Sequence, residues 1–374
     1  MVICVDVQPA VSQRTGVGRY TSRLVEHLGP LMAGTADRLR LFYFDFRGQA
    51  VLPDCPGAER RVVKWCPGRA AQWAWKTLGF PPANLFAGRA DLYHFTNFII
   101  PPLSRGRAVV TIHDVSFLRF PEFAEQRNLD YLRKRIHDTA GRAAAILTLS
   151  QHAAGEIEAL LPGTRGRVFP VPLAVDSGFA RPPEAETAAT LARLGVRRPY
   201  LLTVGTIEPR KNHALLLDAF ERLKTFDGDL VIAGMPGWKC EPIFERMRAS
   251  PAAARIRYLR FVADADLPAL YAGAELLVFP SHYEGFGLPP IEAMACGTAV
   301  LSSCGGALAE TLDGGARLLR DYDPDHWAAE IDALASDAAA RAALVASGRS
   351  HAARFSWAAT ARGTLDVYRK AVAS

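Results

Sequence analysis

Residues 280–292 read PSHYEGFGLPPIE and are the most informative segment of the sequence. It follows Leu276–Phe279, a short apolar run of the kind found in fully buried strands. It leads into a short predicted helix, Ile291–Cys296, which Gly297 ends. A glycine-rich turn between a buried strand and a helix is typical of a ligand loop at the carboxyl edge of a parallel sheet.

Four residues of this stretch indicate which ligand the loop would hold. Gly285 and Gly287 permit close approach of the backbone, and the N–H groups at a helix start suit a phosphate. Glu284 and Glu292 would repel phosphate, so we expect each to accept hydrogen bonds from sugar hydroxyls. An ordinary Gly/Pro turn with two solvated glutamates explains the same residues.

A second segment, VGTIEPRKNH at residues 204–213, also lies between a predicted strand and a predicted helix. Arg210 and Lys211 place two cations in it, and arginine can bind phosphate oxygens bidentately while lysine adds a compact charge. Cations at a helix N-terminus oppose the helix dipole. A bound anion therefore explains this placement better than a solvated basic turn does.

Strands and helices alternate along both halves of the chain, which predicts parallel sheets covered by helices on both faces. The predicted strands are Val2–Val7, Leu39–Phe44, Leu92–Phe95, Ala108–Ile112 and Ala145–Leu149, then Tyr200–Val204, Leu230–Ala233, Arg257–Phe261, Leu276–Phe279 and Ala299–Ser302. A proline-rich stretch, residues 169–183, interrupts the pattern and predicts a linker. The 374 residues exceed what a single core of roughly 250–300 residues accommodates. We therefore expect two doubly wound, Rossmann-like α/β domains facing a central cleft.

Charge and cysteine content narrow the class of protein. Residues 1–180 hold 22 Lys/Arg against 15 Asp/Glu, whereas residues 181–374 hold 22 against 23. A basic first half suits nucleic acid, an anionic membrane surface or a phosphorylated substrate. Six cysteines without a CxxC pair argue against a zinc site and a disulfide scaffold. This composition and the absence of a long apolar run predict a cytoplasmic protein.

The two motifs together resemble the retaining nucleotide-sugar glycosyltransferases of family 4, which have the GT-B fold. The E-x7-E pattern from Glu284 to Glu292 and the upstream V-G-T-x-E-P-R-K-N agree with that family in order, spacing and element context. The resemblance extends over essentially the whole chain and is weakest over residues 45–90. It implies that residues 1–176 bind the acceptor, that residues 177–355 bind the nucleotide sugar, and that a helix within residues 356–374 packs back on the first domain.

The resemblance also implies roles for individual residues. Arg210 and Lys211 match the pair that holds the donor diphosphate, Glu284 matches the glutamate at the transferred sugar, and Glu292 matches the glutamate at the ribose. Backbone groups of Gly205, Gly285, Phe286, Gly287 and Leu288, and the loop after the first strand with Gly16 and Gly18, complete the implied donor site. That first loop reads Thr-Gly-Val-Gly at residues 15–18, where the family has adjacent glycines.

His113 follows a predicted strand and is succeeded by Asp114. Taken by itself, this dipeptide fits a loop histidine that its neighbour satisfies, because it meets no geometric test for catalysis. The resemblance implies instead a catalytic histidine near the reaction centre of the sugar.

The resemblance implies no metal and no cofactor, because the two cations take the place of a metal ion. Asp264, Asp266, Asp321 and Asp323 form two Asp-x-Asp pairs, and we interpret Asp266 as a helix cap before Leu267 rather than a metal ligand. The residues of the Arg210 motif most resemble those found in mannosyltransferases of polysaccharide and O-antigen assembly. GDP-mannose is therefore the favoured donor, followed by UDP- and dTDP-sugars.

The expected acceptor is a glycan or a polyprenyl-diphosphate-linked saccharide. Two tryptophans among cations in residues 69–80 suit a membrane interface and suit equally a core packed under a solvated face. A peripheral position on the inner face of the plasma membrane is thus one expectation. No nucleic-acid-binding signature is present.

Other classes of protein fit the sequence less well than a glycosyltransferase does. A nucleotide-sugar epimerase or a phosphorylase would lack the combined motifs, and a dehydrogenase would need G-x-G-x-x-G where residues 16–21 read GVGRYT. A catalytically silent nucleotide-sugar-binding subunit of a biosynthetic complex remains the alternative from a different class.

Overall fold

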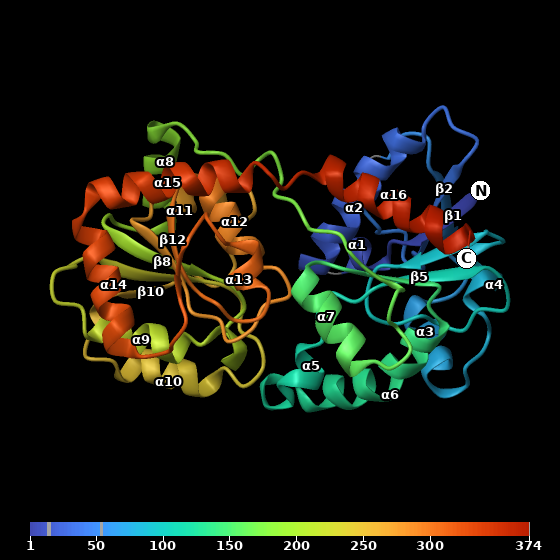
Figure 1. The fold of residues 1–374 in the computed structure, drawn as a ribbon, viewed down its shortest axis with the longest axis horizontal. Coiled ribbons are helices and arrows are strands. Elements are labelled where there is room, and N and C mark those ends of the chain that lie inside the picture. Colours follow the sequence, from blue (N-terminus) through green and yellow to red (C-terminus); the bar gives the residue numbers. More distant parts are fainter. Residues whose placement is uncertain (13–15, 53–54, 374) are drawn as a thin grey trace. The chain divides into compact units, whose positions relative to one another are not determined.

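A computed structural model describes residues 1–12, 16–52 and 55–373, without the side chains of residues 127 and 128. The chain forms two compact units, each described here by itself (Figure 1). Unit 1 comprises Met1–Leu118, Arg127–Leu173 and Trp357–Ser374, and unit 2 comprises Arg119–Gln126 and Ala174–Ser356. Among the described residues, no helix has both the length and the apolar character needed to cross a membrane.

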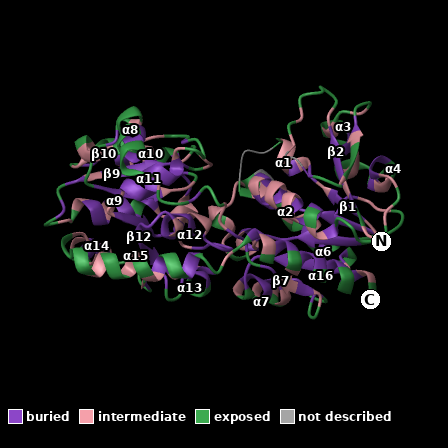
Figure 2. Cartoon of the chain, turned by 90° about the horizontal axis from the view of Figure 1, so that it is seen from above, coloured by how far each residue is buried: buried purple, intermediate pink, exposed green. Residues whose placement is uncertain are grey.

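Unit 1 is built on a parallel sheet of seven strands within the described part of the chain, in the order β3-β2-β1-β4-β5-β6-β7. The strands are β1 (Val2–Asp6), β2 (Arg38–Phe44), β3 (Glu59–Val63), β4 (Leu92–Phe95), β5 (Arg107–Thr111), β6 (Ala145–Thr148) and β7 (Val168–Pro170). The central strands β4 and β6 are buried along their whole length, as parallel strands covered on both faces must be. Figure 2 shows this burial as the purple interior of the unit.

Helices connect and cover these strands. They are α1 (Gln8–Ser12), α2 (Gly16–Met32), α3 (Gly68–Thr77), α4 (Ala83–Ala87), α5 (Ser116–Arg119), α6 (Gln126–Arg142), α7 (Gln151–Leu160) and α16 (Trp357–Ala373). In helix α2 the buried positions Tyr20, Leu24 and Leu28 recur every fourth residue, so one face of the helix packs on the sheet.

Unit 2 contains a parallel sheet of six strands among the described residues, in the order β10-β9-β8-β11-β12-β13. The strands are β8 (Tyr200–Val204), β9 (Asp229–Ala233), β10 (Ile256–Tyr258), β11 (Leu276–Phe279), β12 (Ala299–Ser303) and β13 (Arg317–Leu319). The helices are α8 (Glu184–Leu194), α9 (His213–Glu221), α10 (Glu241–Ala249), α11 (Leu267–Gly273), α12 (Leu288–Ala295), α13 (Leu308–Thr311), α14 (Pro324–Ser336) and α15 (Ala338–Ala352). The two parallel α/β sheets predicted from the alternation are confirmed.

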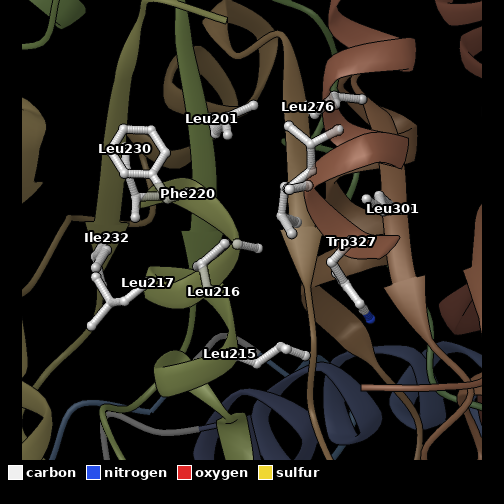
Figure 3. Close-up of a cluster of buried hydrophobic side chains, with 14 of the residues drawn as sticks. Leu201, Leu215, Leu216, Leu217, Phe220, Leu230, Ile232, Leu276, Leu301 and Trp327 are labelled. Atoms are coloured by element: carbon white, nitrogen blue, oxygen red, sulfur yellow. The ribbon is translucent and has the colours of Figure 1, made fainter. Parts of the chain in front are cut away.

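The core of unit 2 lies between its sheet and helices α9 and α14 (Figure 3). Leu216 and Phe220 of α9 and Trp327 of α14 meet Leu276 and Leu301 from the sheet. Trp327 is fully buried, and its indole N–H donates to the carbonyl of Asp321 at 2.9 Å. This packing holds β8 and β11 side by side, and both candidate ligand loops follow these strands.

The last helix, α16, packs against α2 in unit 1 (Figure 1). A buried polar chain ties it to the sheet: the Tyr368 hydroxyl lies 2.6 Å from Nδ1 of His94, and the other ring nitrogen lies 2.8 Å from the Thr111 hydroxyl. Burial lowers the pKa of His94 to about 3, so the ring is neutral near pH 7.

Two local expectations differ from the structure, and one helix lies where no element is predicted. The proline-rich stretch begins as strand β7, because proline is tolerated on an edge strand. The tryptophan-containing segment forms helix α3, for which the sequence predicts no element. Asp266 precedes α11, but its side chain forms no cap hydrogen bond and pairs instead with Arg193 at 2.7 Å. Its own backbone is helical, whereas a capping residue is extended.

The Tyr368→Phe substitution tests the link between α16 and the sheet. Removing the hydroxyl leaves a buried ring nitrogen of His94 unpaired, which costs about 1–3 kcal/mol. We expect a lower urea midpoint by circular dichroism. Arg369→Gln, which changes an exposed ion pair with Asp366 on the same helix, should shift stability by less than about 0.5 kcal/mol. Equal effects of the two changes would contradict the proposed link.

Candidate functional site

The candidate site of unit 2 lies where two neighbouring parallel strands end. Strands β8 and β11 pair in register, with Leu201 opposite Leu276, so the loops that follow them emerge at the same edge of the sheet. The backbone joins these loops directly, because the N–H of His282 donates to the carbonyl of Arg210 at 2.8 Å. The two sequence motifs, 73 residues apart at Lys211 and Glu284, thus form one site.

Arg210 is held by both loops. It lies in a single 3-10 turn, Pro209–Lys211, that precedes α9. Its Nη1 donates to the Tyr283 carbonyl at 2.7 Å and lies 3.1 Å from Oε2 of Glu284, while Nη2 donates to Oε1 of Glu208 at 2.7 Å. These contacts fix the guanidinium plane before any ligand arrives.

Lys211 points to the same carboxylate. Its Nζ donates to Oε1 of Glu284 at 2.5 Å and lies 5.3 Å from the ring centroid of Phe279. Gly205 adjoins the lysine: a Cβ there would lie 3.5 Å from Lys211 Cε, and the φ of +154° is one that other residues rarely adopt. The backbone conformation rather than the available space therefore favours glycine at position 205, because 3.5 Å is an ordinary van der Waals contact.

The site holds two cations and two carboxylates with little exposure. Burial by itself would raise the pKa of Glu284, but the charges of Lys211 and Arg210 outweigh it and lower this pKa to about 2. Burial raises the pKa of Glu208 despite the nearby Arg210. Within the described residues, Oε2 of Glu208 is buried and has no hydrogen-bond partner. An unpartnered buried acceptor beside two cations suits a ligand that brings both a donor group and negative charge.

This pairing changes the interpretation of the two cations. From the sequence, a bound anion best explains cations at a helix start. In the structure, Glu208 and Glu284 supply the compensating negative charge from the chain itself. The prediction that Glu284 contacts sugar hydroxyls is untested, since both of its oxygens face cations here.

Glu292 lies on α12 and is buried. Its Oε2 accepts a hydrogen bond from the Tyr271 hydroxyl at 2.9 Å, so one carboxylate oxygen is engaged by α11. The implied contact with a ribose stays a prediction.

The loop from residue 285 to 288 turns sharply into α12. Gly287 caps the helix with φ +94°, and a Cβ there would lie 2.5 Å from Leu308 Cδ2. Phe286 is buried against Phe355, with ring centroids 5.5 Å apart. Helix α12 begins at Leu288 and continues with two prolines, which carry no N–H. Backbone donors for a ligand must therefore come mainly from the loop rather than from the helix start.

Three features of unit 2 support this site and have no counterpart in the sequence prediction. Glu208 anchors Arg210, and its position two residues before the arginine is the only signal. The carbonyl of Glu284 accepts from Ala307 N–H at 2.8 Å, and a Cβ on Gly306 would come within 2.5 Å of that carbonyl. The Phe123 ring stacks on His282 at 5.2 Å. The last two contacts join elements distant in sequence, which no local pattern reveals.

The remaining predicted site residues lie in unit 1. His113 is buried, with Nε2 3.0 Å from the Thr96 carbonyl and its ring edge-on to Tyr20 at 5.3 Å. Burial lowers the pKa of His113 to about 4, so its imidazole is neutral near pH 7. Gly16 and Gly18 form the first turn of α2 instead of a loop, because the helix begins at Gly16. Thr15 lies outside the described residues.

Comparison with known proteins agrees with these motifs. Residues 192–351 match the family described as "Glycosyl transferases group 1". The chain is 32% identical over 387 residues to O-antigen chain mannosyltransferase B of Escherichia coli, covering 99% of this chain and all of that protein. It is also 35% identical over 196 residues to D-inositol 3-phosphate glycosyltransferase of Salinispora arenicola, covering 49% of this chain and 44% of that relative.

Solved structures share the fold at low sequence identity. Sucrose-phosphate synthase from Thermosynechococcus elongatus aligns with a TM-score of 0.77 at 20% identity, covering 99% of this chain and 98% of that one. WaaG, a glycosyltransferase involved in lipopolysaccharide biosynthesis, aligns with a TM-score of 0.73 at 16% identity, covering 98% and 99%. The predicted GT-B fold is confirmed.

Acid unfolding tests the pairing of Glu284. Its pKa is about 2 in the folded protein and near 4.5 when unfolded, so the pair stabilises the fold above pH 4.5 and the stabilisation disappears as the pH falls toward 2. The shift corresponds to about 3 kcal/mol. We expect Glu284→Gln to be less stable than the native protein at pH 5 and similar to it near pH 2, by urea unfolding.

Glu245→Gln is the matched control, because Glu245 is an exposed glutamate of the same unit. The free energy of unfolding of this variant should differ from that of the native protein by the same amount at pH 5 and at pH 2. A difference for Glu284→Gln that stays constant from pH 5 to pH 2 would contradict the lowered pKa.

Proposed function

Because the chain belongs to the group 1 glycosyl transferases, we propose that it moves a hexose from a nucleoside diphosphate sugar to an acceptor with retention of anomeric configuration and without a metal ion. The observation that carries the proposal is the cluster of Arg210, Lys211 and Glu284 at the carboxyl edge of the unit 2 sheet. In open α/β sheets this edge is where ligands bind.

The proposed reaction separates charge at the donor. The bond from the anomeric carbon to the diphosphate oxygen breaks, and negative charge grows on the leaving diphosphate. Arg210 and Lys211 would stabilise that charge, since fixed cations in a poorly solvated site act strongly and need no reorganisation. The acceptor hydroxyl would bond to the anomeric carbon from the same face, and its proton would pass to the departing diphosphate.

In this proposal Glu284 keeps the two cations in place before the donor binds. The diphosphate then competes for the same donor groups, and the freed carboxylate turns to the hydroxyls of the transferred sugar. The unpartnered oxygen of Glu208 supports a further hydrogen bond to the donor. The cationic side chains take the part that a divalent metal plays in other transferases.

GDP-mannose is the proposed donor. The support is the likeness over almost the whole chain to an O-antigen chain mannosyltransferase. A glycan or a lipid-linked saccharide of cell-surface polysaccharide synthesis is the corresponding acceptor. UDP- and dTDP-sugars are the alternative donors.

We propose in addition that unit 1 binds an anionic membrane surface, which suits a lipid-linked acceptor. Seven exposed large apolar side chains fall within residues 46–85: Phe46, Val51, Trp65, Trp73, Leu78, Phe80 and Leu85. The same residues contain six Lys/Arg and two Asp/Glu. Exposed aromatic and aliphatic side chains interspersed with cations favour the interface of an anionic bilayer.

Substitution at the cluster and a panel of donors test the enzymatic proposal. Arg210→Ala and Lys211→Ala should each lower sugar transfer at least about 100-fold, because each removes a charge from the leaving diphosphate. Lys224→Ala changes an exposed lysine of unit 2 and should retain full activity. GDP-mannose should stabilise the protein against heat more than UDP-sugars do, and EDTA should leave transfer unchanged.

Full activity of either cluster variant would overturn the assigned roles, and loss of activity in EDTA would overturn metal independence. Thermal stabilisation by UDP-sugars alone would identify a UDP-sugar as the donor in place of GDP-mannose. Binding without transfer or hydrolysis for any donor would favour the silent-subunit alternative.

Vesicle sedimentation tests the membrane proposal. The double variant Trp73→Ser, Phe80→Ser removes two exposed aromatic rings and should lower binding to phosphatidylglycerol-containing vesicles at least about fivefold. Phe261→Ser removes an equally exposed ring from unit 2 and should leave binding unchanged. Equal binding by all three proteins would rule out this surface.

A further inference from the structure

Unit 1 contains a cavity whose lining includes none of the residues that the resemblance assigns to the donor site or to catalysis. Its volume is about 250 Å³, and it is lined by side chains that include Asp6, Gln8, Trp75, Lys76, Asn97 and Arg135. At roughly 30 Å³ for each water molecule, it has room for about eight waters, which corresponds to a single sugar-sized group rather than an oligosaccharide.

The cavity lies at the ligand-binding edge of the sheet. Asp6 is the last residue of β1, and Asn97 follows the neighbouring parallel strand β4, whose Phe95 is paired with Asp6. The carboxyl ends of two central strands therefore form its base. Helices α3 and α6 contribute Trp75, Lys76 and Arg135.

The two cations of the cavity are held in place without a carboxylate. Arg135 Nη2 donates to the Trp75 carbonyl at 2.6 Å, and Lys76 Nζ lies 4.3 Å from the ring centroid of Tyr131. In the described part of the chain, neither cation has an acidic partner within ion-pair distance. This contrasts with Arg210 and Lys211, which share Glu284.

The carboxyl group of the cavity offsets at most one of the two positive charges. One oxygen of Asp6 accepts from the Gln8 N–H at 2.9 Å, and burial raises the pKa of Asp6 to about 6. The group is therefore mostly ionised at pH 7, and with two cations in its lining the cavity keeps a net positive charge. Asp6, Gln8 and Asn97 supply hydrogen-bonding groups of the kind that sugar hydroxyls need, and the ring of Trp75 adds an apolar wall.

We propose that this cavity binds a phosphorylated saccharide, with the phosphate at Lys76 and Arg135 and the sugar hydroxyls at Asp6 and Asn97. The inference rests on the proposed function, since the bound group would be the phosphate-bearing end of the acceptor. A soluble sugar phosphate and a lipid-linked saccharide phosphate share this chemistry.

Titration with α-D-mannose 1-phosphate and with mannose tests the cavity in the full-length protein, with and without saturating GDP. The phosphorylated sugar should bind at least tenfold more tightly than mannose in both conditions. Arg135→Gln and Lys76→Gln should each weaken its binding at least tenfold while leaving GDP affinity within twofold. Arg133→Gln, an exposed arginine of the same helix that does not line the cavity, should bind like the native protein.

Two outcomes would overturn the inference. One is equal affinity for mannose and mannose 1-phosphate. The other is binding that survives Arg135→Gln and is lost in Arg210→Ala or under GDP, because the probe would then occupy the donor site. Failure of GDP to bind the native protein would remove the proposed donor site while leaving the cavity result intact, so the two proposals fail separately.

A short-chain prenyl phosphomannose identifies the source of the phosphate group. Tighter binding than that of mannose 1-phosphate, with the same loss in Arg135→Gln, supports the cavity as a lipid-linked acceptor site. Equal binding with that loss supports a soluble sugar phosphate. If Arg135→Gln and Lys76→Gln both bind prenyl phosphomannose as tightly as the native protein does, the assignment of the phosphate to this cavity is overturned.

Discussion

The carboxylate of Glu284 is the interaction on which the candidate donor site depends. It accepts from Lys211 with one oxygen and lies beside Arg210 with the other, so it joins the loop after β8 to the loop after β11. A buried charge without a partner would cost several kcal/mol. Glu284 is therefore tolerable in this buried position because Lys211 and Arg210 face it, while Arg210 has a second carboxylate partner in Glu208.

The fold provides the conditions for that arrangement. Parallel pairing of β8 with β11 brings both loops to one edge, and the core of α9, α14 and the sheet fixes the two strands. Short turns complete the geometry, since Gly205, Gly287 and Gly306 stand where a side chain would meet Lys211, Leu308 or the Glu284 backbone. The protein is a glycosyltransferase of group 1, and this cluster is where its chain concentrates buried charge in unit 2.

The two units handle charge differently. In unit 2 the cations of the cluster are already paired with carboxylates, so an anionic ligand would have to exchange one set of hydrogen bonds for another. In unit 1, a carbonyl holds Arg135 and an aromatic ring holds Lys76, so neither contact neutralises their charge. The buried network around His94 is neutral and links α16 to the sheet instead. The excess of basic residues in the first half thus includes cations that could bind a ligand as well as solvated ones.

The sequence was sufficient to predict the two parallel sheets, the family and the two motifs, because apolar alternation, glycine placement and the Arg-Lys and Glu-x7-Glu spacings are local properties. It did not indicate that Glu284 neutralises Lys211, that Glu208 anchors Arg210, that Gly16 starts a helix, or that Asp266 pairs with Arg193. The sequence also does not predict the cavity at Asp6, because Asp6, Trp75, Asn97 and Arg135 are far apart in the chain. The partners of Glu284 and Asp266 and the lining of the cavity depend on which strand ends and helix faces meet, and no local pattern records that. Glu208 and Gly16 act locally, but their roles depend on how the neighbouring turns fold.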